Sequence, residues 1–480
     1  MYLSELVVFI IYLLIIFVLG VYFALKPKNT NEKAYFIGNR QMGAWVTALS
    51  AGAADMSAWV LMGLPTAVYA LGLRELWIPI GLAAGYILAW VLEAPRLRRF
   101  SILAGDAITL PEYLTKRFFV SSKALQIISA AVFLVAYTVY AASSIKACGI
   151  LFNTITGISA LSAMKVATCI IASYTFVGGF LAVSWIDFFQ GVLMLLSILS
   201  VPIFSALSLK LSAPSTLPSG YLTLFTNWKE VVSGLSWGLG YFGMPHIIVK
   251  FMALKSAAEL NKSAKISIVW SIVIVTFATL IGILGRLLLG FNTAISANSL
   301  VFIVMVRKLF LGVVSGVLLS AVLAASMSSA DNQLLTAASA FANDVYKAAV
   351  RQNSATHKEV LWCGRLVVIA VSLAALAIAS HPSSGSIMSL VKHAWGVFGA
   401  AFGPVMLLSL YYKRLTFLGA AFSIVSGALV DIGWGLYLSA SSGIYELLPG
   451  FVAGLLSAVI VSLIDKKPDI RVQQLFTKAR

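Results

Sequence analysis

The chain contains 480 residues, of which 60% are hydrophobic and only 11% are charged. Ordinary soluble domains carry about 25% charged residues, so this composition excludes a water-soluble enzyme. The formal net charge is +17, but the basic residues lie mainly in short gaps between long apolar runs. That placement favours a membrane-topology signal over nucleic-acid binding. The three cysteines, Cys148, Cys169 and Cys363, match neither a metal-binding pattern nor a disulfide framework.

Apolar runs long enough to cross a bilayer occur along the whole chain. A membrane-spanning helix needs about 20 mostly apolar residues, and long unbroken runs favour helices over barrel strands. No basic leader precedes the first run, so we expect it to be a retained helix rather than a signal peptide. Thirteen spans are predicted, near residues 6–25, 44–70, 77–95, 125–152, 160–182, 188–209, 231–253, 266–289, 303–330, 361–380, 388–411, 416–437 and 445–464.

The distribution of basic residues predicts the orientation of these spans. With the N-terminus outside, 25 of the 34 Lys and Arg residues fall in cytoplasmic segments. The opposite orientation would place them outside, against the positive-inside rule. We therefore predict thirteen spans with the N-terminus outside and a cytoplasmic tail at residues 465–480.

Two of the predicted spans contain residues that weaken a helix. The second, from 50 to 70, reads SAGAADMSAWVLMGLPTAVYA, and the seventh, from 233 to 246, reads SGLSWGLGYFGMPH. Glycine and proline both weaken the helical hydrogen-bond ladder. The two spans are five apart, as expected if spans 2–6 and 7–11 form two inverted five-helix repeats whose broken first helices line a central site.

This spacing predicts the architecture of the chain. We expect one all-α membrane transporter domain over residues 1–480, with core repeats at about 44–209 and 231–411. The predicted helices at 6–25, 416–437 and 445–464 then flank the core.

Asp55 lies inside the second span, where a charge is costly. A charged group at the bilayer centre costs about 3 kcal/mol on insertion scales, and intramembrane acids usually serve a function. We expect Asp55 to belong to a cation site or to support one. The alternative is an aspartate that caps the second half of the broken helix. Ser57 alone is less informative, because a serine in a span is most often bonded to the preceding turn.

Small and polar residues share one face of the ninth predicted span. Ala325, Ser328 and Ser329 are spaced i, i+3 and i+4, so they lie on the same side of a helix. Two hydroxyls, together with carbonyls freed at a helix break, supply the hard oxygen ligands that sodium prefers. The polar run at 331–333 is expected to be the point where this helix leaves the membrane.

Aromatic residues cluster near the two breaks. Trp59 follows Asp55, Trp237 and Tyr241 lie in the seventh span, and Tyr140 lies in the fourth. Ordinary packing explains most aromatics in membrane helices, but the two tryptophans adjoin discontinuities that should line the cavity. Their flat faces suit a small, partly apolar solute with a polar end. Amide groups at half-helix N-termini can hold a carboxylate without an arginine.

Four further charged residues lie near span ends. Lys146 is interpreted as a lysine that snorkels to the membrane surface, and Glu75 as part of a solvated rim. Asp187 is expected close to the cytoplasmic end of the fifth span, in a gate or a cap. Arg40 is interpreted as a topology charge.

Long stretches of the sequence resemble the sodium/solute symporter family, and within it the bacterial members that carry proline. The resemblance extends from about residue 35 to 405. It rests on YFIGNRQMGAWVTALSAGAADMSAWVLMGLP, ITLPEYLTKRF, YTFVGGFLAVSWIDFFQ, WGLGYFGMPHIIVKFMA, LLSAVLAASMSS with NDVYKA, and AWGVFGAAFGP.

The resemblance implies a LeuT-like inverted-repeat core and sodium-driven uptake by alternating access in the bacterial cytoplasmic membrane. It implies no enzyme activity, no organic cofactor, no nucleic-acid binding and no obligate protein partner. The partners that it implies are the sodium ion, the lipid bilayer and a small solute, proline.

The resemblance also implies the residues of the site. The implied sodium ligands and their supports are the carbonyls of Ala53 and Met56, Ala325, Ser328 and Ser329, and, for coupling, Asp55 and Ser57. The implied proline contacts are Trp59, Gly63, Tyr140, Trp237, Tyr241 and Pro245.

Departures from the family pattern leave the cargo open. Met244 stands where proline carriers tend to have glutamine, and Ser329 replaces a threonine while keeping its oxygen. Other amino acids, betaine-like zwitterions and carboxylates such as pantothenate are alternative cargoes, and Asp55 alone does not decide between sodium and proton coupling. A transporter-like membrane sensor and a channel are alternatives from different classes. The short tail argues against a sensor, and the matched broken helices argue against a channel.

Overall fold

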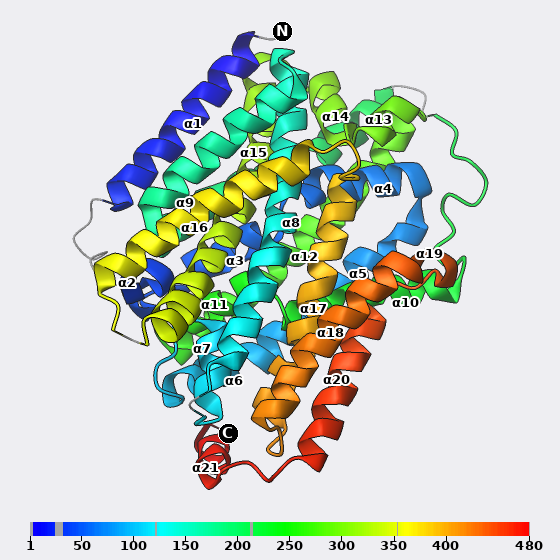
Figure 1. Cartoon of the computed structure of the whole chain (residues 1–480). Coiled ribbons are helices and arrows are strands. Elements are labelled where there is room, and N and C mark those ends of the chain that lie inside the picture. Colours follow the sequence, from blue (N-terminus) through cyan, green and yellow to red (C-terminus); the bar gives the residue numbers. More distant parts are fainter. Residues whose placement is uncertain (1–2, 25–31, 121, 212–214, 353, 480) are drawn as a thin grey trace.

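The computed structural model describes residues 3–24, 32–120, 122–211, 215–352 and 354–479. Over these residues the chain forms helices joined by loops, and the pairing of Met42 with Leu254 is an isolated β-bridge. Figure 1 shows the helices gathered in one bundle, with the start of α1 at one end and α21 at the other. The predicted all-helical class is confirmed.

The bundle is built mainly from long apolar helices. The longer elements are α1 (Leu3–Ala24), α3 (Ala44–Asp55), α5 (Trp77–Leu88), α6 (Ala94–Leu103), α8 (Ala124–Thr156), α9 (Ala160–Leu211), α12 (Ala257–Leu289), α15 (Gly312–Ser339), α16 (His357–Ser380), α17 (Ile387–Tyr411), α18 (Phe417–Tyr437), α20 (Leu447–Ile464) and α21 (Ile470–Ala479). The shorter ones are α2 (Glu32–Ile37), α4 (Leu64–Leu71), α7 (Leu110–Arg117), α10 (Trp228–Ser236), α11 (Pro245–Ala253), α13 (Thr293–Ala297), α14 (Val301–Leu309) and α19 (Ser439–Ser442).

The number of spans is lower than predicted when only long apolar helices are counted. Within the described residues, ten helices are long and apolar enough to cross a membrane, and the bent pair of α3 with 59–71 makes eleven. The predicted span at 160–182 corresponds to a shorter apolar helix, Ala160–Phe176. The predicted span at 231–253 corresponds to the interrupted segment α10–α11. The count of thirteen is therefore not confirmed.

A glycine divides α9 into two segments. Gly179 has φ 65° and ψ −177°, outside the helical region, and a Cβ there would lie 2.7 Å from Cδ2 of Tyr35. The chain therefore turns three residues before the end of the predicted fifth span. Asp187 consequently lies inside the second segment, Gly179–Lys210, so its predicted position near a span end is wrong.

The first predicted break is present between α3 and α4. Helix α3 ends at Asp55, and a π-helical turn, Trp59–Gly63, leads into α4. The two halves of the span meet at an angle of 59°. Pro65 follows directly in α4 and has no N–H with which to continue the hydrogen-bond ladder of this turn, in which the Leu64 N–H donates to the Trp59 carbonyl.

The second predicted break is present between α10 and α11. A 3-10 turn, Trp237–Phe242, follows α10. Met244 then takes an extended conformation, with φ −85° and ψ 103°. Pro245 opens α11, a position for which its fixed φ is suited.

Helix α5 packs closely against α10 and the 3-10 turn that follows it. A Cβ on Gly85 would lie 2.1 Å from the carbonyl oxygen of Gly238, and a Cβ on Gly234 would lie 2.4 Å from Cβ of Trp77. The backbones thus touch along this seam, and only glycine permits that approach.

Helix α15 also lies in the interior of the bundle, and most of its residues are buried. Its polar run at 331–333 is buried, with Asp331 and Gln333 at 0% exposure. The apolar helix continues through this run as one 39-residue span to Val350. The polar run is therefore enclosed by other helices and not exposed at a helix end, and the point where this helix leaves the membrane stays a prediction.

Candidate functional site

The first break lies against two serine hydroxyls of α15. Ser328 Oγ donates a hydrogen bond to the Ala53 carbonyl at 2.9 Å, and Ser329 Oγ donates one to the Ala54 carbonyl at 2.8 Å. Ser328 Oγ also lies 3.2 Å from the Ala325 carbonyl. A helix end leaves its last four carbonyls without intrahelical partners, so the break exposes oxygens where the hydroxyls reach them. Oxygen atoms from two helices thus converge in a buried site.

Two members of the predicted sodium set adjoin this cluster in the unwound turn. Met56 is fully buried, and its N–H donates to the Gly52 carbonyl at 2.8 Å. Ser57 is also buried, and its Oγ lies 3.5 Å from the Trp59 amide. The carbonyl of Ala54 was absent from the predicted set. The general rule that a helix end frees several carbonyls would have included it.

Asp55 connects the first break to the second. Its Oδ2 accepts a hydrogen bond from the Tyr241 hydroxyl at 2.7 Å. Its Oδ1 is buried and has no hydrogen-bond partner among the described residues. The π-helical turn that begins at Trp59 has no side-chain cap, so the alternative role of Asp55 as a helix cap gains no support.

The predicted aromatic residues are all buried around the breaks. Trp59, Tyr140, Trp237 and Tyr241 are each at most 4% exposed. The Tyr140 hydroxyl has no hydrogen-bond partner among the described residues. Trp237 stacks on Tyr445, with ring centroids 4.9 Å apart.

The two remaining predicted substrate residues occupy the breaks themselves. Gly63 closes the π-helical turn, where a Cβ would lie 3.5 Å from Cβ of Trp59 and 3.6 Å from Sδ of Met388. Pro245 is the first residue of α11.

Sequence reasoning missed several groups that hold the second break in place. Trp395 Nε1 donates to the Trp237 carbonyl at 2.8 Å, and its ring lies edge-on to Tyr241 at 5.0 Å. Tyr137 OH accepts a hydrogen bond from the His246 amide at 2.9 Å. Trp395 lies in AWGVFGAAFGP, a stretch that carries the family resemblance, and Tyr137 lies in the predicted fourth span, but neither adjoins a break in the sequence.

A cavity of about 520 Å³ opens at the end of the bundle where α4 ends and α10 begins. We call it the α4–α10 cavity. Trp237, the first residue of the turn at the second break, lines this cavity, as does Met388, which adjoins Gly63 of the first break. Its lining residues include Arg74, Glu75, Glu230, Lys392 and Tyr445. Glu75 is therefore part of a cavity wall.

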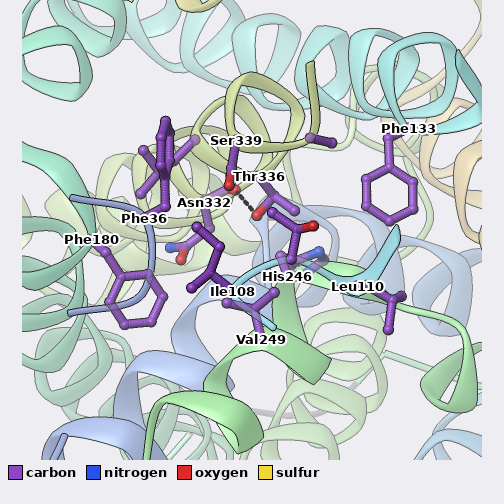
Figure 2. Close-up of a pocket in the computed structure, with 13 residues that line it drawn as sticks. Phe36, Ile108, Leu110, Phe133, Phe180, His246, Val249, Asn332, Thr336 and Ser339 are labelled. Atoms are coloured by element: carbon purple, nitrogen blue, oxygen red, sulfur yellow. Dashed lines mark hydrogen bonds between the residues drawn. The ribbon is translucent and has the colours of Figure 1, made fainter. Parts of the chain in front are cut away.

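On the other side of the breaks lies a small enclosed cavity, shown in Figure 2. His246 of α11 faces Asn332, Thr336 and Ser339 of α15, with phenylalanine side chains around them. The volume, about 20 Å³, is enough for about one water molecule. The free space beside His246 is therefore too small for a solute larger than water.

A buried ionic network lies beside the site. Lys250 Nζ lies 3.4 Å from Asp187 Oδ2, and both side chains are fully buried. The same carboxylate oxygen accepts hydrogen bonds from Ser50 Oγ at 2.7 Å and Asn332 Nδ2 at 2.8 Å. Asp187 thus joins α3, α9, α11 and α15, a role that its sequence position did not indicate.

Arg40 also has more contacts than a topology charge requires. Its Nε donates to Asp106 Oδ1 at 2.8 Å, and its Nη2 donates to the Ala107 carbonyl at 2.6 Å. Partial burial raises the pKa of the Asp106 carboxyl, but hydrogen bonds from Lys33 and Arg40 outweigh it and hold the pKa below its ordinary value. Arg40 thus fastens the segment before α3 to the loop after α6.

Lys146 reaches a loop at one end of the bundle. Its Nζ donates to Ser384 Oγ at 2.8 Å and also to the Gly385 carbonyl. The ammonium is thereby bound to the loop between α16 and α17.

Comparison with known proteins gives one consistent family. Residues 35–427 match the model of the sodium:solute symporter family. The chain is 40% identical to the osmoregulated proline transporter OpuE of Bacillus subtilis, over 95% of each chain. It is also 40% identical to the sodium/proline symporter of Salmonella typhimurium, over 99% of this chain and 96% of that one.

Solved structures with a similar fold cover almost the whole chain. A Na⁺-coupled sialic acid symporter in a substrate-bound outward-open state matches with a TM-score of 0.76 at 18% identity, over 97% of this chain and 99% of the other. Mhp1, a nucleobase-cation-symport-1 family transporter in a closed conformation, matches with a TM-score of 0.57 at 13% identity, over 95% and 96%. The predicted LeuT-like fold is confirmed.

Proposed function

Because the chain belongs to the sodium:solute symporter family, we propose that it takes up proline together with sodium. Relatives at 40% identity that are named proline transporters support this cargo. We further propose that the protein lies in the bacterial cytoplasmic membrane with its N-terminus outside. The excess of Lys and Arg in the segments that this orientation places inside supports it.

The sodium site that we propose rests on one observation, the pairing of two α15 hydroxyls with the carbonyls freed at the first break. A sodium ion between the two helices would replace these hydrogen bonds. Each hydroxyl would rotate its proton away and offer a lone pair to the ion. With the carbonyls of Ala53, Met56 and Ala325, Ser328 and Ser329 complete a set of five hard oxygens.

Asp55 supplies the negative charge of the proposed sodium site. It is buried next to the freed carbonyls, and its Oδ1 is without a partner among the described residues. A buried carboxylate is costly unless a positive charge compensates it. A bound sodium ion offsets that cost, and Ser57 in the same turn supports the coupling.

The proline site that we propose lies between the two breaks. The indoles of Trp59 and Trp237 offer flat apolar surfaces to the pyrrolidine ring, and Gly63 keeps the π-helical turn open. The unpartnered hydroxyl of Tyr140 offers a hydrogen bond. The N-terminus of α11, which begins at Pro245, favours the carboxylate.

Transport then follows from the two cavities. Sodium and proline enter from the α4–α10 cavity. The side chains of Trp237 and Met388 then close over them, and the small cavity beside His246 widens to release them. One charge crossing the membrane supplies about 2.3 kcal/mol per 100 mV. This corresponds to about 40-fold accumulation, before the sodium concentration gradient is added.

The test is radiolabelled proline uptake into proteoliposomes, with and without an inward sodium gradient. Ser329→Ala removes one proposed ligand, and we expect the sodium concentration for half-maximal uptake to rise about tenfold, the effect of about 1.4 kcal/mol. Ser326→Ala is the matched control, because Ser326 Oγ donates a hydrogen bond to the Val322 carbonyl of its own helix at 2.8 Å and not to the freed carbonyls of the first break.

Three outcomes separate the parts of this proposal. Equal sodium dependence in the two variants would reject the serine site. Sodium-dependent uptake of another amino acid, without proline uptake, would reject the cargo and retain the site. Uptake driven by a proton gradient alone would reject sodium as the coupling ion.

A further inference from the structure

Helix α21 packs its apolar side onto the rest of the protein. Its buried residues are Val472, Leu475, Phe476 and Ala479. They are spaced i, i+3, i+4 and i+7, so they share one face of the helix, whereas Ile470 of the same helix is 63% exposed. Figure 1 shows α21 at the end of the bundle, next to α6. The segment predicted to be a tail thus contains a docked amphipathic helix.

Helix α21 joins parts of the chain that are far apart in the sequence. The ring of Phe476 lies edge-on to Phe100 of α6, with ring centroids 5.8 Å apart. Arg471 Cζ lies 5.1 Å from the centroid of the Phe119 ring, which follows α7. Lys413 Nζ, in the loop between α17 and α18, lies 5.6 Å from the centroid of the Phe476 ring. Helix α21 thus bridges α6, the end of α7 and the loop after α17.

The α6–α7 segment, which we define as residues 94–119, also forms part of the wall of the small enclosed cavity. Ile108, Thr109 and Leu110 of this segment line the cavity together with His246. The proposed release route passes through this cavity, whose volume is about 20 Å³. Because side chains in a protein interior are closely packed, release of a solute requires the walls to separate, and the α6–α7 segment is one of these walls.

A direct hydrogen bond joins the α6–α7 segment to α17. Arg117 Nε donates to the Ser409 carbonyl of α17 at 2.6 Å. Helix α21 spans the same joint, because Phe476 lies against a residue of the α6–α7 segment and against Lys413, which follows α17. A movement that separates the α6–α7 segment from the end of α17 therefore also breaks contacts of α21.

We propose that α21 is a strap that restrains the opening of the small cavity. When it is docked, exposure of its apolar face adds to the free energy needed to move the α6–α7 segment. When it is released, the direct bonds between this segment and α17 remain. The strap acts on the opening and not on the ligands, because the ring contacts of α21 involve no residue of the two breaks. The inference rests on the proposed function, since it places the small cavity on the release route.

The experiment measures how fast a cysteine in the wall of the small cavity reacts with a membrane-impermeant maleimide. Ser339→Cys is a small change at a buried position of this wall. It is introduced into a chain in which Cys169 and Cys363 are replaced by serine, while the buried Cys148 is retained. Inside-out and right-side-out vesicles, without sodium or proline, give the rate from each face. When opening and closing are fast, this rate follows the population of the open form.

Phe476→Ala removes the ring through which α21 contacts both sides of the joint. We expect it to raise the labelling rate about fivefold from the face on which α21 lies, a change that corresponds to about 1 kcal/mol. Ile470→Ala is the matched control, because it removes an exposed apolar side chain from the same helix. The rate in this control should equal that of the parent chain.

Each contrary result has a definite meaning. Equal rates in Phe476→Ala and the parent chain would overturn the proposal, and so would an equal rise in Phe476→Ala and Ile470→Ala. If Phe476→Ala does not fold, Lys413→Gln combined with Arg471→Gln removes two contacts of the strap without creating a cavity. This variant should raise the rate about twofold, and an unchanged rate would overturn the proposal. Absence of proline uptake by the wild type would reject the proposed cargo, whereas labelling without solute would still decide whether α21 restrains the cavity.

Discussion

The two broken helices show how similar interruptions acquire different chemistry. At the first break, serine hydroxyls of α15 face the freed carbonyls of Ala53 and Ala54. At the second break, the Trp237 carbonyl is bound by the indole of Trp395, and ring systems surround Tyr241. The break itself supplies only unpaired backbone groups. The side chains of the facing helix decide whether those groups suit a hard cation or an apolar ring.

The largest expected effect of this difference is at Asp55, the carboxylate of the first break. Asp55→Asn keeps the shape and removes the charge. A unit charge on the order of 6 Å from the ion, at an effective dielectric constant of about 20, contributes about 2.8 kcal/mol. We therefore expect the sodium concentration for half-maximal proline uptake to rise about 100-fold, measured in proteoliposomes.

Asp344→Asn is the matched control for Asp55→Asn. Asp344 is also fully buried, but it accepts hydrogen bonds from Thr109 and Gln126, away from the breaks. In Asp344→Asn, the sodium concentration for half-maximal proline uptake should stay within threefold of the wild-type value. A similar rise in the required sodium concentration in both variants would mean that any buried carboxylate is required. The proposed role of Asp55 at the first break would then be contradicted.

A smaller effect is expected at the second break. Trp395→Phe retains an aromatic ring beside Tyr241 but removes the donor to the Trp237 carbonyl. The loss of one neutral hydrogen bond costs about 1 kcal/mol, so KM for proline should rise about fivefold at unchanged sodium dependence. Trp434→Phe removes an indole donor to the Ile444 carbonyl, outside both breaks, and should leave KM unchanged. An effect of Trp395→Phe on sodium dependence alone would contradict the division between the breaks.

The smallest effect is expected for Met244→Gln. Met244 is buried directly before Pro245, and the substitution conserves its approximate size. We expect KM for proline to change by no more than about threefold, with no change in sodium dependence. Competition with a panel of amino acids measures the shift in preference. A tenfold change in sodium dependence would show that the second break also determines ion binding.

The helical class, the two breaks and the serine pair were predictable from the sequence because each leaves a local signal. Gly and Pro mark the breaks, and Ser328 and Ser329 lie at helical spacing from Ala325. The boundary at Gly179 was missed because apolar residues continue on both sides of it. Hydropathy records the length of an apolar run but not a change of direction within it.

The buried contacts between distant segments were not predictable. Asp187 and Lys250 are 63 residues apart, and Arg40 and Asp106 are 66 apart. Asp187 and Arg40 were interpreted from their neighbours in the sequence, which are apolar or lie near a span end. Only the packing of α3, α9, α11 and α15 shows that Asp187 has partners. Likewise, only the packing of α17 shows that Trp395 binds the second break.

The hydrogen bond between Tyr241 and Asp55 connects the two breaks directly. It joins a residue of one break to the carboxylate of the other at 2.7 Å. Any factor by which an ion at the first break tightens solute binding at the second is, by linkage, the factor by which solute tightens ion binding. A protein that lost this contact would be expected to bind each ligand more independently, and a carrier that binds its ligands independently leaks one without the other.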